Sequence, residues 1–473
     1  MSASTRRNLM LILIPLMVMM IGTQRILDPQ IREIHKGEKT ALAGLSNEFI
    51  LGPMLGLQQA VAGLLWIRAD EFFHEGDYDA ILPIVRMVTW LDPHQLDVYI
   101  TGAWHLSYNF TDSFERSDRR YIPASQKLLE EGDANNTTVY DIAFELGWEN
   151  ADKIKNYDRA EKWFRIATTR KAQDDTGKAV KPAPLFVWHQ VAHSLERQGR
   201  IDEAVEIWRH VLTLSEAKLK DNPKDFSTRN VRDSERHNLE LNLKRKYSRY
   251  VHRMDWDVDK EQTRSINPVT GEPIPSNAYI ETSGPNAGKP RPASTATPWN
   301  CAFDARPTFT APRVLEIKGN FTVGDGARVN IRLADEDWKE HELEKFDFNI
   351  DQSQTIMMDQ HSVRGGHWGR KIDMSKDPKM YSFTRDYYYL VFEFNPRGTS
   401  PFIQDKFGWS GEGLTDSSKV LWIQPSRNPK AAPIRMLRKV YKLSRAQILG
   451  SEPITEKNVV PNTEYAKIQN SPE

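Results

Sequence analysis

The sequence predicts an α+β chain of several domains: an N-terminal membrane-anchor helix, a solenoid of paired helices, and an antiparallel β-sandwich with a C-terminal amphipathic helix. Three observations predict this order. An apolar run follows two arginines near the N-terminus, tryptophan and alanine recur at intervals of 36 to 44 residues, and short β-branched and aromatic runs replace the helical pattern after Arg313. The expected segments are an anchor at 1–27, a connecting segment at 28–56, helical repeats at 57–254, a proline-rich linker at 255–312, the β-sandwich at 313–425, and a basic helix and tail at 426–473.

Composition narrows the class of protein. The chain has 473 residues, 64 basic and 64 acidic side chains, one cysteine and a mean hydropathy of −0.60. This length predicts about two or three domains, and the hydropathy excludes a polytopic membrane protein. Equal numbers of acids and bases lack the basic excess typical of general nucleic-acid binders, so no nucleic-acid partner is expected. The single Cys301 excludes an intramolecular disulfide and a CxxC pair.

An apolar run at the N-terminus has the layout of a signal sequence or signal anchor. Leu9–Gly22 is apolar and follows Arg6 and Arg7. A helix over this run is about 21 Å long, and extension over residues 8–27 gives about 30 Å, the thickness of a hydrocarbon core. No small-x-small cleavage site follows, so we expect an uncleaved anchor that contacts the lipid bilayer through residues 9–27. The protein would then be single-pass, with its body outside the cytoplasm, either periplasmic or exterior.

A second uncharged stretch, Phe49–Ile67, leaves two structures open. It is either a further membrane segment or a helix packed on the next element. Pro53, Gln58 and Gln59 lie within it, and it leads without a break into an amphipathic pattern. We therefore favour the packed helix.

Tryptophan and alanine recur through residues 57–254. Four tryptophans lie 38, 44 and 40 residues apart, and four alanines lie 44, 36 and 44 residues apart. A large apolar residue follows each alanine four positions later and fills the groove beside the close helix contact that alanine allows. Each tryptophan therefore marks the first helix, and each alanine the second, of a helix-turn-helix unit. These residues are Trp66, Trp104, Trp148 and Trp188, then Ala80, Ala124, Ala160 and Ala204, and then Ile84, Leu128, Phe164 and Trp208.

The most regular unit spans residues 185–218, with RQGRIDEAVEIW as its turn and second helix. Its spaced positions are Trp188, Val191, Ala192, Leu195, Gly199, Ala204, Trp208 and Val211. On these residues the segment from about 57 to 218 resembles the tetratricopeptide repeat family. The distance from tryptophan to alanine varies from 12 to 20 residues, so the first three units depart from the family pattern. A long helix, Asp225–Arg253, is expected to cap the open end.

The resemblance implies a concave surface lined by the first helices, which in this family receives an extended peptide or a partner helix. We expect the four tryptophans themselves to be core residues. In the best unit the groove-facing positions would be Phe186, His189, His193, Glu196 and Arg197. His189 and His193 could also chelate a metal, but no third ligand is evident nearby and a hydrated groove face is favoured.

The composition changes after residue 254. Nine prolines and three glycines between residues 256 and 312 exclude helix and regular sheet, so a linker is expected there. After Arg313, short runs separated by turns predict the strands of an antiparallel sandwich or barrel. The runs are VLEIKGNF, ARVNIRLAD, KFDFNID, TIMMD and YYYLVFEF, and the last, apolar on both faces, is the expected central strand.

No complete catalytic or cofactor motif is present. The sequence GWSG at Gly408–Gly411 lacks the final glycine of a nucleophile elbow, and neither a Walker loop nor a dinucleotide fingerprint occurs. We therefore expect no catalytic residue, no metal and no cofactor. The loop His361–Trp368 could hold a ligand or a metal, but loops also concentrate turn residues, and an ordered loop between strands is the favoured interpretation.

The segment PIRMLRKVYKLSRAQIL predicts a basic amphipathic helix near the C-terminus. Ile434, Leu437, Tyr441 and Ile448 would share one face of this helix. It would either lie on an anionic membrane surface or dock on the chain's own domains, and its short length favours docking. Its basic side chains are Arg435, Arg438, Lys439, Lys442 and Arg445.

Together these patterns predict a membrane-anchored, non-catalytic scaffold of the cell envelope that binds partner proteins on the groove of the repeats. The alternative is a ligand- or glycan-binding β domain, or a hydrolytic one, that the repeats recruit. A soluble cytoplasmic protein is a third hypothesis.

Overall fold

The structure is a computed structural model, which describes part of the chain. The described residues are 58–110, 119–174, 178–247, 254–257, 262–266, 273–274, 299–338, 346–348, 355–375, 383–400, 403–404, 407–415, 420–424 and 433–470. Within these ranges no helix has both the length and the apolar character that crossing a membrane requires. The expected anchor at 1–27 and connecting segment at 28–56 lie outside the described residues. The chain divides into two compact units, residues 1–102 and residues 103–473.

In the described residues of the first unit, two helices pack against each other. Helix α3 (Gln58–Glu75) packs against α4 (Tyr78–Leu91). The described part of the uncharged stretch Phe49–Ile67 is the beginning of α3, which agrees with the packed-helix interpretation for those residues. Ala62 is buried there, whereas Leu64 and Ile67 are exposed, so this helix buries one narrow face only.

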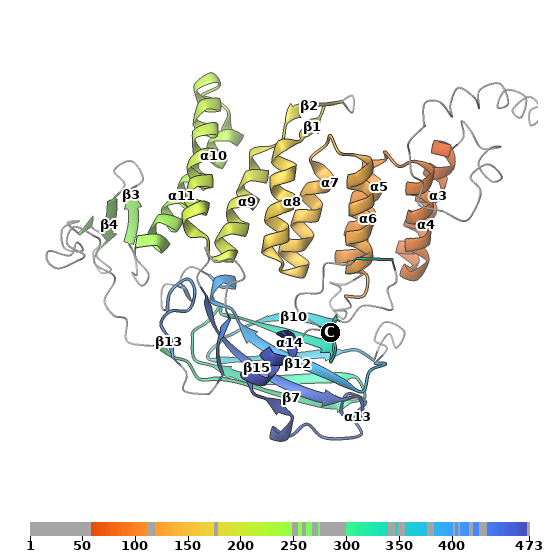
Figure 1. The fold of residues 1–473 in the computed structure, drawn as a ribbon, viewed down its shortest axis with the longest axis vertical. Coiled ribbons are helices and arrows are strands. Elements are labelled where there is room, and N and C mark those ends of the chain that lie inside the picture. Colours follow the sequence, from red (N-terminus) through yellow and green to blue (C-terminus); the bar gives the residue numbers. More distant parts are fainter. Residues whose placement is uncertain are drawn as a thin grey trace, which may run out of the picture. The chain divides into compact units, whose positions relative to one another are not determined.

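Helices continue through the repeat region, and each helix from α6 to α11 packs against the next one along the chain (Figure 1). Two first helices, α5 and α7, run on into π-helical segments, η2 and η3. The tryptophans fall on α3, α5, α7 and α9 and the alanines on α4, α6, α8 and α10, which confirms the predicted alternation of first and second helices. The bounds are α5 Leu96–Trp104, η2 His105–Asn109, α6 Ile122–Asn135, α7 Asp141–Glu149, η3 Asn150–Ile154, α8 Tyr157–Thr169, α9 Leu185–Gln198, α10 Ile201–Asp221 and α11 Phe226–Tyr247, with a hairpin of β1 (Lys171–Gln173) and β2 (Ala179–Pro182) between α8 and α9.

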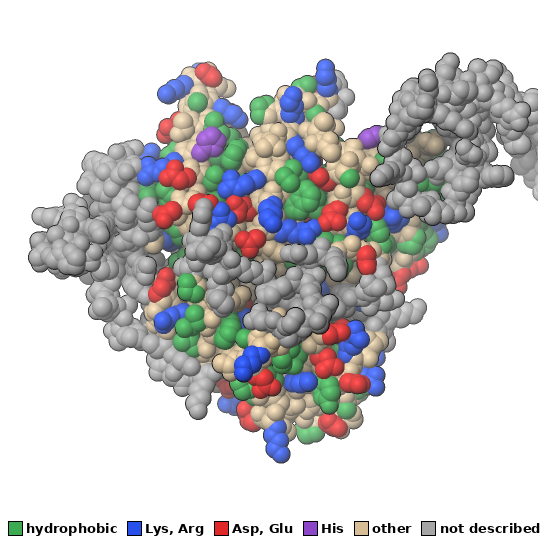
Figure 2. Space-filling model, in the orientation of Figure 1, with side chains coloured by type: hydrophobic (Ala, Val, Ile, Leu, Met, Phe, Trp, Pro, Cys, Tyr) green, Lys and Arg blue, Asp and Glu red, His purple; other side chains and the backbone are tan. Residues whose placement is uncertain are grey.

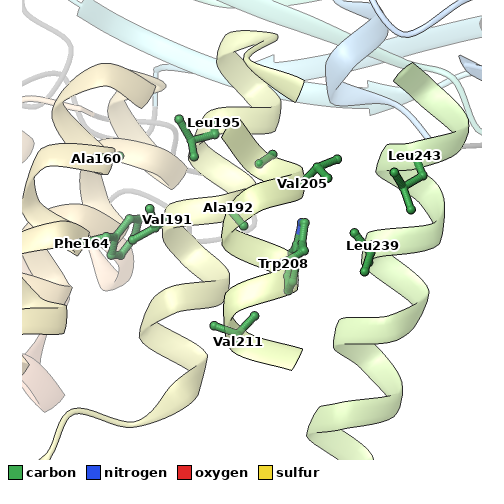
Figure 3. Close-up of a cluster of buried hydrophobic side chains, with 11 residues drawn as sticks. Ala160, Phe164, Val191, Ala192, Leu195, Val205, Trp208, Val211, Leu239 and Leu243 are labelled. Atoms are coloured by element: carbon green, nitrogen blue, oxygen red, sulfur yellow. The ribbon is translucent and has the colours of Figure 1, made fainter. Parts of the chain in front are cut away.

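One cluster of buried side chains joins helices α8, α9, α10 and α11. Ala160 and Ala204 are fully buried, and Phe164 and Trp208 pack one turn further on, as their spacing predicted (Figure 3). A Cβ atom added to Gly147 in α7 would lie 2.6 Å from the Phe164 ring, so only glycine permits this approach of α7 to α8. Leu239 and Leu243 of α11 close the same cluster at the end of the helical array.

The expectation that the repeated tryptophans are core residues was wrong for Trp104 and Trp148, whereas Trp188 packs against the helical core. Trp66 and Trp188 are half-buried, and Trp104 and Trp148 are exposed by 49% and 37% of their surface. Trp148 lies 12 residues before its alanine and Trp188 lies 16 before its own, so the two side chains occupy different turns of their helices. In α7 the inner positions belong instead to the buried residues Ile142, Ala143, Leu146 and Gly147.

After the helices, the second compact unit (residues 103–473) continues with two antiparallel sheets. The larger sheet has the order β10-β9-β12-β15-β14, with β16 paired to β15, and the smaller has the order β11-β8-β7. Strand β12, the YYYLVFEF run, pairs with β9 on one side and β15 on the other, which confirms it as a central strand. The bounds are β7 Phe303–Ala311, β8 Val314–Phe321, β9 Arg328–Asp335, β10 Thr355–Ser362, β11 His367–Asp373, β12 Tyr387–Phe394, β14 Leu421–Gln424, β15 Ile434–Ser444 and β16 Val459–Val460. Of the expected KFDFNID run, residues 346–348 are described, and they form no strand.

Aromatic side chains join the two sheets. The ring centroids of Phe394 and Phe321 lie 4.8 Å apart, and those of Phe392 and Trp368 lie 5.7 Å apart. The hydroxyl of Tyr441 donates a 2.7 Å hydrogen bond to the carbonyl of Ala305 in β7. The opposite face of β12 packs on helix α14 (Asn462–Asn470) through Tyr465. Both faces of β12 are therefore covered, which explains its continuous apolar sequence.

The proline-rich segment contains short strands, contrary to the expectation that prolines exclude regular sheet there. One small sheet contains β3 (Met254–Asp257), β4 (Gln262–Ile266) and β5 (Pro273–Ile274), and β6 (Trp299–Asn300) pairs in parallel with β13 (Leu414–Thr415). Strand β7 also begins before residue 313. Pro307 is tolerated in β7 because this strand lies at the edge of its sheet, where a missing N–H costs no ladder bond.

The predicted basic amphipathic helix was also wrong. Its sequence forms strand β15 and then one short helical turn, α13 (Arg445–Ile448). Met436, Val440 and Leu443 are buried in addition to the residues of the expected helical face, so the segment buries both of its faces. Pairing with β12 and β14 satisfies its backbone from both sides, and this tertiary context decides the structure over the local helical period.

Candidate binding face of the first helices

The five residues expected to line a groove all lie in or at the end of α9, but their surroundings differ. Phe186 is exposed by 41% of its surface. The Nε2 atom of His189 lies 2.8 Å from Oε1 of Glu235 in α11, and Nδ1 of His193 lies 3.0 Å from Oε2 of Glu196. These two histidines therefore have carboxylate partners within the helices, and they do not form a pair that faces a common ligand.

Glu196 is the centre of a buried polar cluster. Its Oε1 atom accepts hydrogen bonds from Trp208 Nε1 at 2.8 Å and from Asn242 Nδ2 at 2.6 Å, and Arg245 lies 3.5 Å from Oε2. Burial alone would raise the pKa of Glu196, but His193, Arg245 and Trp208 outweigh it and lower this pKa to about 2. The side chain is thus an ionised structural group that joins α9, α10 and α11.

A loop of the β domain closes over the same end of α9. Trp409 Nε1 donates a 3.1 Å hydrogen bond to the carbonyl of Glu196, and the Arg245 guanidinium lies 3.8 Å from the centroid of a Trp409 ring. Arg397, in the 3-10 turn η6 (Pro396–Gly398), donates to the carbonyl of Arg197 at 3.3 Å. We call Glu196, Arg245, Arg397 and Trp409 the clamp.

The turn after α9 is shaped to fit the clamp. Gly199 has φ of 80°, a left-handed conformation that favours glycine, and a Cβ atom there would meet the Arg397 guanidinium. The Nη1 atom of Arg197 is buried without a hydrogen-bond partner among the described residues. Of the five expected groove residues, Glu196 and Arg197 therefore lie against the chain's own β domain. The GWSG sequence belongs to this loop, where Ser410 Oγ accepts hydrogen bonds from Arg397.

The exposed part of the first-helix face lies in the preceding units. We define the aromatic strip as Trp104, Tyr108, Phe144, Trp148 and Phe186. Trp104 stacks on Tyr108 and Phe144 on Trp148, with centroids 6.0 and 6.3 Å apart, and Phe186 meets Phe144 edge-on at 5.2 Å. Sequence reasoning missed this strip, although two aromatic pairs at i, i+4 spacing were a readable signal.

Carboxylates accompany the strip on α7. Glu149 is fully buried and accepts hydrogen bonds from Ser125 Oγ at 2.5 Å and Gln126 Nε2 at 2.7 Å, and burial raises its pKa to about 7. Glu145 is half-buried, and burial, followed by the nearby Glu149 and Asp141, raises its pKa to about 7 as well. This part of the face therefore combines aromatic rings with the half-buried Glu145, whose carboxyl group ionises only near neutral pH.

The basic residues of the expected amphipathic helix do not form one surface. Arg438 is buried and pairs with Glu393 at 2.7 Å, and Lys439 pairs with Asp304 at 3.0 Å. Lys442 lies 3.7 Å from Glu336, and Arg435 donates to the carbonyl of Leu414. Arg445 is exposed at the start of α13. Basic and acidic side chains are likewise interspersed over the face of the molecule drawn in Figure 2.

The loop His361–Trp368 is a tight connection between the two sheets. His361 lies near the end of β10, and His367 begins β11 with its Nδ1 atom 2.8 Å from Asn320 Oδ1. Trp368 is buried over Gly319 and belongs to the aromatic core. No group of three or more metal-ligating side chains is found in the part of the chain that the structure describes.

Comparisons with known proteins give weak structural matches only. No family model matches the sequence, and no curated protein matches it. Among solved structures, a MamA protein is 14% identical with a TM-score of 0.24, and the match covers 38% of this chain and 87% of that one. A thermophilic tetratricopeptide repeat protein of Thermus thermophilus, TTC0263, is 17% identical with a TM-score of 0.25, and the match covers 39% of this chain and 89% of that one. Such distant similarity establishes neither a shared family nor a shared partner.

Proposed function

We propose that this protein is a non-catalytic scaffold that binds another protein through the aromatic strip on its tetratricopeptide-like first helices. The observation that carries the proposal is the exposure of Trp104, Trp148 and Phe186 on consecutive first helices. Large aromatic side chains usually reach the interior, and a group of them left in solvent is typical of an interaction site. Tryptophan also dominates the binding energy of many protein interfaces.

Photo-crosslinking tests this proposal in the intact chain. A benzophenone amino acid at position 186 should crosslink a partner in living cells, and the additional change Trp148→Ala should reduce the yield about ten-fold by removing a central contact. The matched control places the same probe at Ile166, an exposed apolar position on second helix α8. Equal yields at positions 186 and 166, or a yield that Trp148→Ala leaves unchanged, would refute a binding role for the strip.

We further propose that the chain is held in a membrane by residues 9–27, with its body outside the cytoplasm as part of an envelope assembly. The apolar run Leu9–Gly22 behind Arg6 and Arg7 supports this proposal. The single Cys301 is compatible with an oxidising compartment, since no second thiol is present in the chain to mispair with it.

Two fusions and one truncation test the membrane proposal. Alkaline phosphatase at the C-terminus should be active and green fluorescent protein at the same position dark, because the former matures outside the cytoplasm. Removal of residues 1–27 should move the protein from the membrane to the soluble fraction. The opposite reporter pattern, or a full-length chain already in the soluble fraction, would contradict it.

A further inference from the structure

Glu145 is a half-buried carboxyl group among acidic neighbours. It lies on α7 three residues before Trp148, and the charged groups that act on it are Glu149 and Asp141, both acidic. The charge of Glu145 also contributes to the raised pKa of the Tyr108 phenol. Within the described residues Glu145 has neither a hydrogen-bond partner nor an ion-pair partner, although it is half-buried. Burial without a cation favours the protonated form of such a carboxyl group, and a cation bound beside it would favour the ionised form.

Two lysines that follow α7 have other partners. Lys153 is buried with its ammonium 3.9 Å from the centroid of the Tyr108 ring, and its charge acts on Glu149. Lys155 lies 3.6 Å from Asp152, whose other carboxylate oxygen accepts a hydrogen bond from the Tyr108 hydroxyl at 3.1 Å. These contacts leave Glu145 as the carboxylate of this face that the described part of the protein does not neutralise.

The surrounding rings suit a cationic side chain. Trp104 stacks on Tyr108, on which the charge of Glu145 acts, and Trp148 follows Glu145 by one turn of helix. Both tryptophans are exposed. Aromatic faces attract lysine and arginine, with tryptophan the strongest, and a neighbouring carboxylate adds a charge pair. The Lys153 ammonium over Tyr108 shows the same chemistry inside this chain.

We propose that the aromatic strip takes a partner segment that carries a lysine or an arginine, and that Glu145 receives this cation between Trp104 and Trp148. The proposal rests on the proposed function, because it assigns the chemistry of the partner at the same face. The apolar stems of lysine and arginine would lie on the rings, and the charged head would reach the carboxylate. Glu145 then sets the specificity of the face, and the tryptophans supply most of its affinity.

The test uses the full-length chain and four pools of fluorescent peptides. Each pool has a fixed central lysine, arginine, glutamine or glutamate, with mixed alanine, leucine, phenylalanine and proline at all other positions. The wild type should bind the lysine and arginine pools about ten-fold more tightly than the glutamine pool. Glu145→Gln should remove this preference and retain the affinity for the glutamine pool, because the variant keeps the aromatic surface. Glu206→Gln, the same change at an exposed position of second helix α10, should behave as the wild type.

The outcomes separate this inference from the proposed function. If all pools bind equally and Trp148→Ala weakens them all, the strip is a binding face and the cation preference is refuted. If no pool binds, or if Trp148→Ala has no effect, both proposals fail. Thermal melting of Glu145→Gln should be equal to or above that of the wild type, since a desolvated charge is removed, and a lower melting temperature would show that Glu145 has a structural role instead.

Discussion

The first helices show two contrasting regions on one repeated face. At the end of the array, α9 is covered: Glu196 is buried, and Trp409 and Arg397 of the β domain bond to the carbonyls of Glu196 and Arg197. In the preceding units the face is open, and the rings of Trp104 and Trp148 remain in solvent. The first helices are thus covered by the chain's own β domain in one unit and exposed in the preceding units.

The two regions also differ in their side chains: the covered region is polar and the open region is aromatic. In the covered region the buried carboxylate is satisfied internally, since Glu196 has Asn242, Arg245, His193 and Trp208 as partners. The open region is built from stacked rings and one carboxylate without a partner among the described residues. Substitutions in the covered region should therefore change stability, and substitutions in the open region should change binding.

The largest effect is expected from Trp208→Ala. Trp208 is fully buried and donates to Glu196, so its loss opens a cavity and removes a donor from a buried carboxylate. The free energy of unfolding should fall by about 3–5 kcal/mol. Chemical denaturation followed by circular dichroism measures it, and a loss below about 1 kcal/mol would mean that the core of this unit lies elsewhere.

Trp409→Ala should have the next largest effect. The change removes the hydrogen bond to Glu196 and the stacking on Arg245, at an expected cost of about 2–3 kcal/mol. Amide hydrogen exchange should become faster in α9 to α11. Trp422→Ala, a half-buried position on β14, serves as the control and should leave exchange in these helices unchanged. Equal protection in both variants would show that the clamp does not stabilise the helices.

Glu196→Gln should cost about 2 kcal/mol at neutral pH, and the cost should depend on pH. The pKa of Glu196 falls from 4.5 to about 2 on folding, so its ionised form contributes stability that is present above pH 4.5 and is lost as the pH falls toward 2. The difference between wild type and variant should accordingly shrink between pH 6 and pH 3. Urea denaturation at several pH values checks this, and a difference that stays constant would assign the cost to packing alone.

The smallest effect on stability is expected for Trp148→Ala, about 1 kcal/mol or less, because the ring is partly in solvent and its stacking partner is Phe144. A cost comparable with that of Trp208→Ala would erase the distinction between the open and the covered region. Differential scanning calorimetry of the two variants side by side makes the comparison direct.

Much of the fold was readable from the sequence, because its signals are local. Alanine followed by a large residue one turn later located the second helices, and Ala204 with Trp208 packs as that spacing predicts. The alternating and apolar runs likewise located β8, β9 and β12. Strand β15 was missed because its apolar and basic residues fit a helical period, and only the partners β12 and β14, distant in sequence, determine its structure.

The candidate site was less predictable, for physical reasons that specific residues illustrate. The π-helical segments η2 and η3 change the register of the first helices, and a spacing rule that treats Trp148 as equivalent to Trp188 cannot anticipate their different exposure. Trp409 covers α9 through a contact between residues 213 positions apart in the chain. No sequence pattern predicts such a contact. Phe186 is exposed because it precedes the part of α9 that the loop covers, and its place in a binding groove stays a prediction.

The single cysteine is a natural probe of local opening in the β domain. Cys301 is buried beside β6, the strand that pairs with β13 just after the loop of Trp409. A thiol in that position reacts with an alkylating reagent only while the surrounding sheet is open, and no second thiol in the chain contributes to the signal. The rate of its alkylation under native conditions therefore reports how often this part of the β domain opens, without any engineered label.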